Sequence, residues 1–356
     1  MLGTEELSTG FGKIFLHDLA CITSHTRPLE FEDELIDVVT NGVAHVGSVV
    51  VCRVEAVGIH QRLENRSGTL DSIRPGDLIM GVMGNRHSPV SIYGGLPDSG
   101  IELPRVELID LLSSGGVIGE CSSCPSYLGS PTKLHIVGLA AQKGKLLEII
   151  PWLKNENLRI SCPLILVSGT SSEVGKTRFA SNLIRFLSQN LGQTVAATKL
   201  TGTGDLEDLL ELHEAGAELL FDLVDAGLVT TYTVSKDVVV EITKGVLNHL
   251  GKKNPGVIIA ELGGDILAPN ADAIIADKEI SDAASAMILI PSEILAAYGA
   301  LKYLEERGFP ISKVYIAQPK KNPEASQERA GYILHYKLYD CANDEDLADL
   351  VEKILG

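Results

Sequence analysis

The sequence predicts an α/β protein in which a smaller β-rich part precedes a C-terminal part with a mostly parallel sheet. Two observations predict this class. From residue 163 onward, short apolar runs alternate with longer amphipathic stretches, a pattern typical of parallel strands covered by helices. Before residue 155, the apolar runs are short, rich in Val and Ile, and separated by turn residues, which favours antiparallel strands.

Composition narrows the class of protein. The 356 residues correspond to about two domains. Hydrophobic residues make up 45% and charged residues 22%, as in ordinary globular proteins. No apolar run approaches the ~18 residues of a membrane span, and the first residues lack the pattern of a secretory signal. The net charge of −17 disfavours nucleic acid as a partner, and six cysteines do not make a disulfide scaffold. We therefore expect a cytoplasmic protein that binds neither nucleic acid nor membranes.

Residues 1–155 are expected to form the β-rich domain. Strand-like runs occur at 46–57, 77–83 and 134–139, and the sequence NRSG at 65–68 indicates a turn. We expect a small barrel or sandwich, and no motif here indicates its role. The domain boundary falls between Lys145 and Pro163, where the polar, asparagine-rich segment 152–157 suits a linker.

Residues 160–356 are expected to form the second domain. The apolar runs predict strands at 164–167, 194–198, 256–260, 287–290, 314–317 and 332–338. The amphipathic stretches predict helices at 175–191, 206–223, 236–250, 294–307 and 344–355.

The most informative motif is a glycine-rich loop between the first of these strands and the first helix. Its residues are Gly169, Thr170, Ser171, Ser172, Glu173, Val174, Gly175, Lys176 and Thr177. Backbone N–H groups at a helix start, together with the helix dipole, favour phosphate oxygens. In a P-loop, the lysine reaches the β- and γ-phosphates and the following hydroxyl binds Mg²⁺. We therefore expect a P-loop NTPase domain that binds ATP and Mg²⁺ through these residues.

The spacing of the loop departs from the standard motif, because five residues rather than four separate Gly169 from Gly175. The sequence GTSSEVGKT resembles the loop of dethiobiotin synthetase and its relatives. Two further segments are similar to that family: Lys199 in TKLTGT, where Leu200 replaces the family's proline, and Glu261 in AELGGD. The resemblance spans residues 163–317 and does not extend to the first domain.

The resemblance implies roles for these residues. Lys199, with Lys176, would supply positive charge to the phosphate and to a substrate carboxylate. Glu261 would lie by the magnesium ion with Thr177. Because Mg²⁺ prefers one or two carboxylates, a second acidic ligand is expected. Asp205 is our candidate, although it could instead cap a helix, and Asp222 and Asp225 remain alternatives.

The same resemblance implies an ATP-dependent ligase or synthetase. Such an enzyme would activate a small-molecule acid by phosphoryl transfer before an amine attacks, and it would form a homodimer. Dethiobiotin synthetase itself is a smaller, single-domain enzyme, so the acid substrate is left open. Two alternatives stand beside this interpretation. One is a CoA-dependent N-acetyltransferase of the D-glutamate N-acetyltransferase type, and the other is a nucleotide-gated regulatory module.

Two further sequence patterns are a cysteine pair in the first domain and a polar segment after a late strand of the second. Cys121 and Cys124 form a lone C-x-x-C, for which free thiols are the expected state, since no second pair has zinc-ligand spacing. Gln318 and the following segment 320–323 come after a late strand, where we expect contact with the base of a nucleotide.

Overall fold

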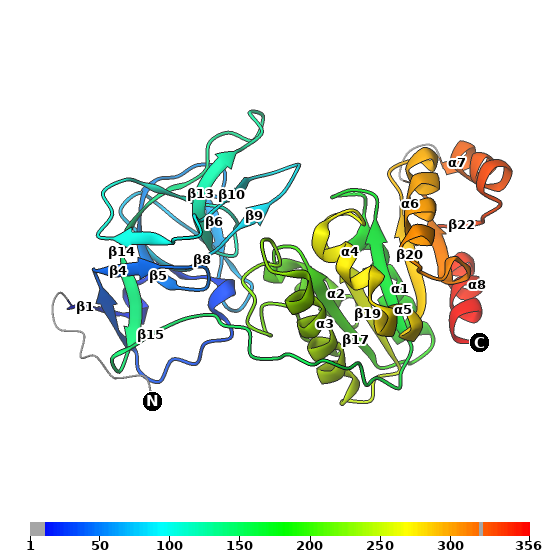
Figure 1. Ribbon diagram of the computed structural model, residues 1–356, viewed down its shortest axis with the longest axis horizontal. Coiled ribbons are helices and arrows are strands. Elements are labelled where there is room, and N and C mark those ends of the chain that lie inside the picture. The colour runs from blue at the N-terminus through cyan, green and yellow to red at the C-terminus, as the bar shows by residue number, and fades with distance from the viewer. Residues whose placement is uncertain (1–10, 320–322) are drawn as a thin grey trace. The chain divides into compact units, whose positions relative to one another are not determined.

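The chain folds into two compact units, drawn mainly in blue to cyan and in green to red in Figure 1. The computed structural model describes residues 11–319 and 323–356. The first unit extends to Pro151 and also includes two later segments, Thr203–Glu207 and Gly227–Tyr232. The second unit comprises Trp152–Gly202, Asp208–Ala226 and Thr233–Gly356. The chain therefore returns twice to the first unit after the second has begun.

The first unit consists mainly of short strands. They are β1 (Phe11–Phe15), β2 (Cys21–Ile22), β3 (Leu35–Val39), β4 (Gly42–Ala44), β5 (Val49–Ala56), β6 (Arg62–Glu64), β7 (Leu70–Ser72), β8 (Leu78–Met83), β9 (Arg86–His87), β10 (Tyr93–Gly95), β11 (Ile101–Leu103), β12 (Ile109–Leu111), β13 (Val117–Ser123), β14 (Lys133–Gln142) and β15 (Lys145–Leu146). Two 3₁₀ turns, η1 (Leu16–Asp18) and η2 (Ser24–Thr26), lie beside β2.

Five of these strands close into a ring. β14 pairs with β5, β5 with β8, β8 with β13, β13 with β12, and β12 returns to β14. A sheet whose last strand pairs with its first is a barrel. Of the two forms expected from the sequence, a barrel or a sandwich, the β-rich part therefore has the barrel. Most pairs are antiparallel, as expected, but β8 runs parallel to β13 and to β2. Parallel neighbours need a long connection, which the segment between β8 and β13 provides.

Alternation along β5 shows how the barrel wall is packed. Val50, Cys52 and Val54 lie in one hydrophobic cluster, while Val49 and Val51 lie in another. Successive side chains of a strand point to opposite faces. All five side chains are fully buried. The continuous apolar run in the sequence therefore reflects a strand that is covered on both faces.

The second unit alternates strands and helices. They are β16 (Leu164–Gly169), α1 (Lys176–Arg185), β17 (Val195–Thr201), α2 (Leu206–Glu214), β18 (Leu219–Leu220), α3 (Lys236–Gly251), β19 (Val257–Leu262), α4 (Pro269–Ala276), α5 (Lys278–Ala283), β20 (Ala284–Ile290), α6 (Ile294–Glu306), β21 (Val314–Ala317), α7 (Pro323–Arg329), β22 (Leu338–Tyr339) and α8 (Asp344–Leu355). The first two residues of α2 belong to the first unit.

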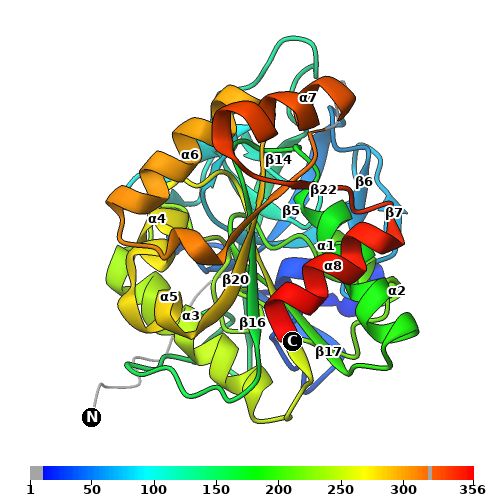
Figure 2. The ribbon, with the colours of Figure 1, turned by 90° about the vertical axis from the view of Figure 1, so that its right-hand side faces the viewer.

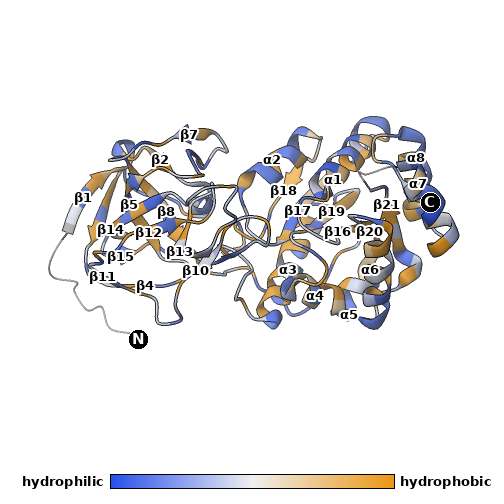
Figure 3. Ribbon diagram, turned by 90° about the horizontal axis from the view of Figure 1, so that it is seen from above, coloured by the Kyte–Doolittle hydropathy of each residue, from blue (hydrophilic) through white to orange (hydrophobic). Residues whose placement is uncertain are grey.

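These strands form one sheet in the order β18-β17-β19-β16-β20-β21-β22, and every adjacent pair is parallel. This confirms the predicted parallel sheet. Helices α1 and α8 cover one face and α3, α4, α5 and α6 the other (Figure 2). Figure 3 shows apolar residues on the strands and mixed colouring on the helices, as amphipathic helices require. The central strand β16 ends at Gly169, which places the glycine-rich loop at the carboxyl edge of the sheet.

Two predicted elements were wrong. The helix predicted at 206–223 ends at Glu214, because Gly216 adopts a left-handed φ of 114°, and the short strand β18 follows. The strand predicted at 332–338 is reduced to β22, because residues Ala330–Leu334 continue α7 as a helical turn. Tyr332 is 85% exposed, so this apolar run does not mark a buried strand.

Candidate functional site

The loop between β16 and α1 has the backbone of a tight phosphate-binding turn. Gly175 precedes the helix with a φ of 108°, a left-handed conformation that glycine adopts without steric cost. Glu173 also has a positive φ, of 62°. At Gly169, an added Cβ would lie 2.7 Å from Cγ2 of Val174, so the loop closes against its own first residue. The sequence motif and the local geometry therefore agree.

The Lys176 side chain lies between this loop and the segment after β19. It is the first residue of α1 and is 6% exposed. Its ammonium donates hydrogen bonds to the backbone oxygens of Ser171, at 3.1 Å, and Gly264, at 2.7 Å. Burial lowers the pKa of Lys176, and the nearby carboxylate of Glu261 opposes that shift. The lysine thus links the loop to the segment that follows β19.

Thr177 is the point at which two carboxylates meet. Its hydroxyl lies 3.2 Å from Oε1 of Glu261 and 3.4 Å from Oδ1 of Asp208. Glu261 is near the end of β19, in register with Val167 of β16 and Lys199 of β17. Asp208 is the third residue of α2 and forms an ion pair with Lys199. Two strands and two helices therefore bring polar residues to one edge of the sheet.

The pKa of the Glu261 carboxyl group is raised by its surroundings. It is 3% exposed, and burial, with the charge of Asp208, raises its pKa to about 7 against the opposing charges of Lys199 and Lys176. Its Oε2 is buried and has no hydrogen-bond partner among the described residues. An unsatisfied buried carboxylate oxygen is costly unless a cation completes its surroundings.

These residues fit a magnesium ion. Mg²⁺ takes hard oxygen ligands and is usually held by one or two protein carboxylates beside phosphate and water. The hydroxyl of Thr177, the carboxylate of Asp208 and the orphaned oxygen of Glu261 form such a set.

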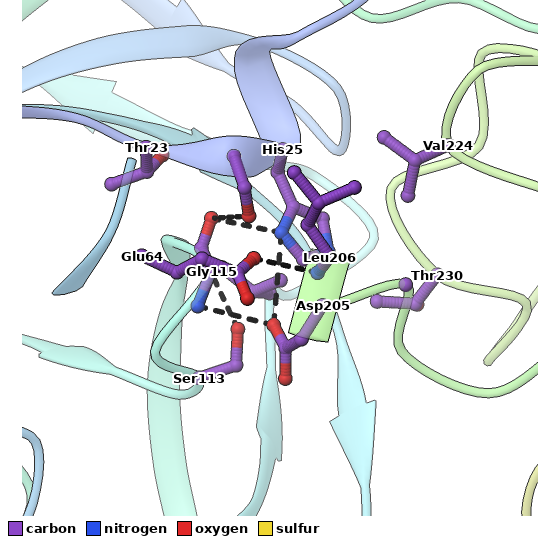
Figure 4. A network of polar contacts seen from close by, with 12 residues as sticks. Thr23, His25, Glu64, Ser113, Gly115, Asp205, Leu206, Val224 and Thr230 are labelled. Atoms are coloured by element: carbon purple, nitrogen blue, oxygen red, sulfur yellow. Dashed lines mark hydrogen bonds and ion pairs between the residues drawn. The ribbon is translucent and has the colours of Figure 1, made fainter. Parts of the chain in front are cut away.

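Asp205, the expected second carboxylate ligand of Mg²⁺, contacts a backbone group of the first unit. Its carboxylate accepts a hydrogen bond from the backbone N–H of Gly115, at 3.1 Å, within the first unit (Figure 4). The aspartate that lies beside Thr177 is instead Asp208, which the sequence reading did not single out. Asp222 and Asp225, the other candidates, are joined in a local turn in which the Asp225 N–H donates to Asp222. The signal that could have indicated Asp208 is its place in the first turn of the helix that follows Lys199.

A cavity of about 290 Å³ opens beside the loop in the second unit. Its lining includes Val174 and Gly175 of the loop, Gln318 after β21, and Asp340 and Cys341 after β22. Gln318, expected to face a base, therefore lines a cavity adjacent to the glycine-rich loop. Lys320, Lys321 and Asn322, to which the same expectation extended, lie outside the described residues.

Across residues 11–319 and 323–356, no group of three or more His, Cys, Asp or Glu side chains is arranged to hold a metal ion, and the candidate site itself contains two carboxylates and a hydroxyl. Cys121 and Cys124 are both free thiols. In the same part of the chain, no helix is both long and apolar enough to cross a membrane.

No family model matches the chain, and no curated protein matches it. Solved structures that match part of this chain include a ParA family ATPase from Chlorobium tepidum TLS (12% identity, TM-score 0.34), covering 54% of this chain and 94% of that one. The signal recognition particle 54 kDa protein from Aeropyrum pernix K1, in complex with GDP, is 16% identical (TM-score 0.37), covering 57% and 51%. A DUF1611 family protein from Anabaena variabilis is 14% identical (TM-score 0.35), covering 60% and 66%. At such low TM-scores, nothing about activity follows from these likenesses.

Proposed function

We propose that this chain binds Mg·ATP at the loop Gly169–Thr177 and transfers the γ-phosphoryl group to the carboxylate of a small-molecule acid. The observation that carries the proposal is the meeting of Lys176, Thr177, Lys199, Asp208 and Glu261 at the carboxyl edge of one parallel sheet. Ligands of open α/β sheets bind at this edge.

In the proposed reaction, each side chain has a separate task. Backbone N–H groups of the loop hold the phosphates, and the ammonium of Lys176 turns from the carbonyls of Ser171 and Gly264 to the phosphate oxygens. Thr177, Asp208 and Glu261 would hold Mg²⁺, which when bound neutralises charge on the β- and γ-phosphates. Lys199, released from Asp208, would orient the substrate carboxylate. Phosphoryl transfer requires little more than positioning and charge stabilisation.

The proposed reaction consumes ATP, the acid and an amine, and it releases ADP, inorganic phosphate and the proton that the amine loses. A carboxylate oxygen of the substrate attacks the γ-phosphorus, the bond to the bridging oxygen breaks, and ADP leaves. The acyl phosphate then reacts with an amine, and inorganic phosphate leaves as the amide forms. The resemblance of the loop and of the segments around Lys199 and Glu261 to dethiobiotin synthetase supports this reaction class.

The test uses a trap for the intermediate. Purified protein is incubated with Mg·ATP, a panel of mono- and dicarboxylic acids, and hydroxylamine, which converts an acyl phosphate into a hydroxamate. We expect ADP and hydroxamate in equal amounts with at least one acid, and neither product from Lys176→Ala. ADP release that no acid stimulates would contradict the ligase proposal, and thiol release from acetyl-CoA without ATP would favour the acetyltransferase alternative. The expected homodimer is tested separately by light scattering.

A further inference from the structure

The cysteine pair Cys121 and Cys124 lies at the end of β13, within the first unit. In a regular strand, successive side chains point to opposite faces, so two residues three apart face away from each other. Two thiols in that arrangement cannot be joined without movement of the backbone. The local backbone of β13 therefore decides whether these two thiols can react as a pair.

A β-bulge changes the alternation of side chains at this point. Consecutive residues of β10 lie opposite Cys121 and Ser123 of β13, so Ser122 is an extra residue in the pairing. One extra residue moves every side chain beyond it to the other face of the strand. The side chain of Cys124 is consequently directed to the same face as that of Cys121.

The packing of the two side chains agrees with this placement. Both are partly buried against the same hydrophobic cluster, to which Val117, four residues before Cys121, also belongs. Burial, then the charge of Asp110, then that of Cys124 raise the pKa of the Cys121 thiol. Because the effect of a charge decreases with distance, the last of these contributions indicates that the two sulfur atoms are neighbours.

The thiol of Cys124 has only weak partners. Its Sγ lies 3.4 Å from the backbone oxygen of Gly129 and 3.9 Å from that of Pro125. A thiol is a weak donor, so these contacts are readily given up when the sulfur forms another bond. Among the described residues, no further His, Cys, Asp or Glu completes a metal site with the pair. A covalent bond between the two sulfurs is therefore the reaction that this arrangement favours.

We propose that Cys121 and Cys124 are a site of reversible oxidation, at which a small-molecule disulfide such as glutathione disulfide converts the two thiols to an intramolecular disulfide. The Cys124 thiolate attacks one sulfur of glutathione disulfide, the bond between its sulfurs breaks, and one glutathione leaves and takes up a proton. The Cys121 sulfur then attacks that of Cys124, and the second glutathione leaves with the proton that Cys121 loses. The protein gives up two electrons and two protons, and the small molecule gains them.

The order of attack follows from the surroundings of the two thiols. The thiolate is the nucleophile, and the raised pKa of Cys121 keeps that thiol protonated. Cys124 is therefore the attacking thiol, and Cys121 resolves the mixed disulfide. The first unit thereby acquires a covalent state that follows the thiol–disulfide balance of its surroundings. This inference does not depend on the proposed function, because neither thiol takes part in it.

The experiment treats the folded wild-type chain with excess glutathione disulfide, blocks the remaining thiols by alkylation, and measures tryptic peptides by mass spectrometry. Arg105 and Lys133 are successive cleavage sites, so both thiols lie on one peptide, 106–133, which contains no other cysteine. The disulfide lowers the mass of the reduced peptide by two hydrogens, whereas a mixed disulfide adds glutathione. We expect the intramolecular form to exceed the mixed form about tenfold and dithiothreitol to reverse it.

The same chain provides the controls. Cys162 and Cys341 are partly buried free thiols on separate peptides, and each should add one glutathione. Cys121→Ser removes the resolving thiol, so the peptide should retain one glutathione on Cys124. The double variant Ser123→Cys/Cys124→Ser moves the second thiol to the opposite face of the strand, so its peptide should also add glutathione instead of closing.

Each outcome supports or overturns the proposal. A wild-type peptide that carries glutathione on both thiols, or that remains reduced, overturns it. Equal closure in wild type and in Ser123→Cys/Cys124→Ser also overturns it, because closure would then not depend on the bulge. The measurement on wild type needs no substitution, so it decides the question even if a variant does not fold.

Discussion

Replacing Glu261 by glutamine should make the metal-free protein more stable at alkaline pH relative to wild type. The Glu261 carboxyl is buried, and its pKa is raised from 4.5 to about 7, first by burial and then by the charge of Asp208. Between these two pH values the folded chain binds a proton at this site that the unfolded chain has lost. Ionised Glu261 is therefore a cost to the folded state above pH 7.

The size of the effect follows from the same shift. A pKa difference of one unit corresponds to about 1.36 kcal/mol. Because the pKa of Glu261 rises from 4.5 to about 7, wild type should lose about 3 kcal/mol of unfolding free energy between pH 4.5 and pH 8 through this group. Glutamine has the same shape, keeps an acceptor for Thr177 and does not ionise. The variant should lack this loss.

The chain's one tryptophan provides the assay. Trp152 belongs to the second unit, packs edge-on against Phe221 and donates to the backbone oxygen of Asp225. Its fluorescence during urea unfolding, measured with EDTA at pH 5 and pH 8, gives the stability of that unit for both proteins. A difference between the variants that is the same at both pH values would refute the reasoning, because it would mean that Glu261 does not titrate in the folded state.

Three further predictions concern the same unit. Gly175→Ala places a side chain on a residue with left-handed backbone angles and should lower the free energy of unfolding by about 1–2 kcal/mol. Nucleotide binding, measured by titration, should also weaken, and unchanged binding would contradict the role of the loop in holding phosphates. Leu166→Ala opens a cavity on the central strand and should cost about 2–5 kcal/mol by urea unfolding, whereas a loss below 1 kcal/mol would mean that the site collapses. Lys199→Met should lower kcat for acid-stimulated ADP release by about 100-fold and leave the dissociation constant of Mg·ATP nearly unchanged; a loss confined to nucleotide binding would place Lys199 on the nucleotide rather than on the substrate carboxylate.

The sequence was most informative where local and long-range preferences agree. The strands around the loop are continuous apolar runs, and buried parallel strands require that pattern. The loop could be located because its glycines are needed by its own backbone, at Gly169 and Gly175. Lys199 and Glu261 could be selected because each lies near the carboxyl end of a strand.

Other features depend on contacts between residues far apart in the chain. The short helices α4, α5 and α7 have too few turns to show a clear period. Asp208 and Asp205 are three residues apart, and only the tertiary contacts of Thr177 and Gly115 distinguish them. The pairing of Glu64 with Leu206 spans 142 residues, and no local pattern encodes it. The polar site was therefore predictable as a region, but its full set of residues was not.

The most direct test of the central claim is isothermal titration of the wild-type protein and of Lys176→Ala with Mg·ATP and Mg·GTP. We expect wild type to bind at least one of them with one site per chain and the variant to lose that binding, since its ammonium is the charge that faces the loop. Equal binding by both proteins, or binding by neither, would contradict the account of Gly169–Thr177 as a nucleotide site.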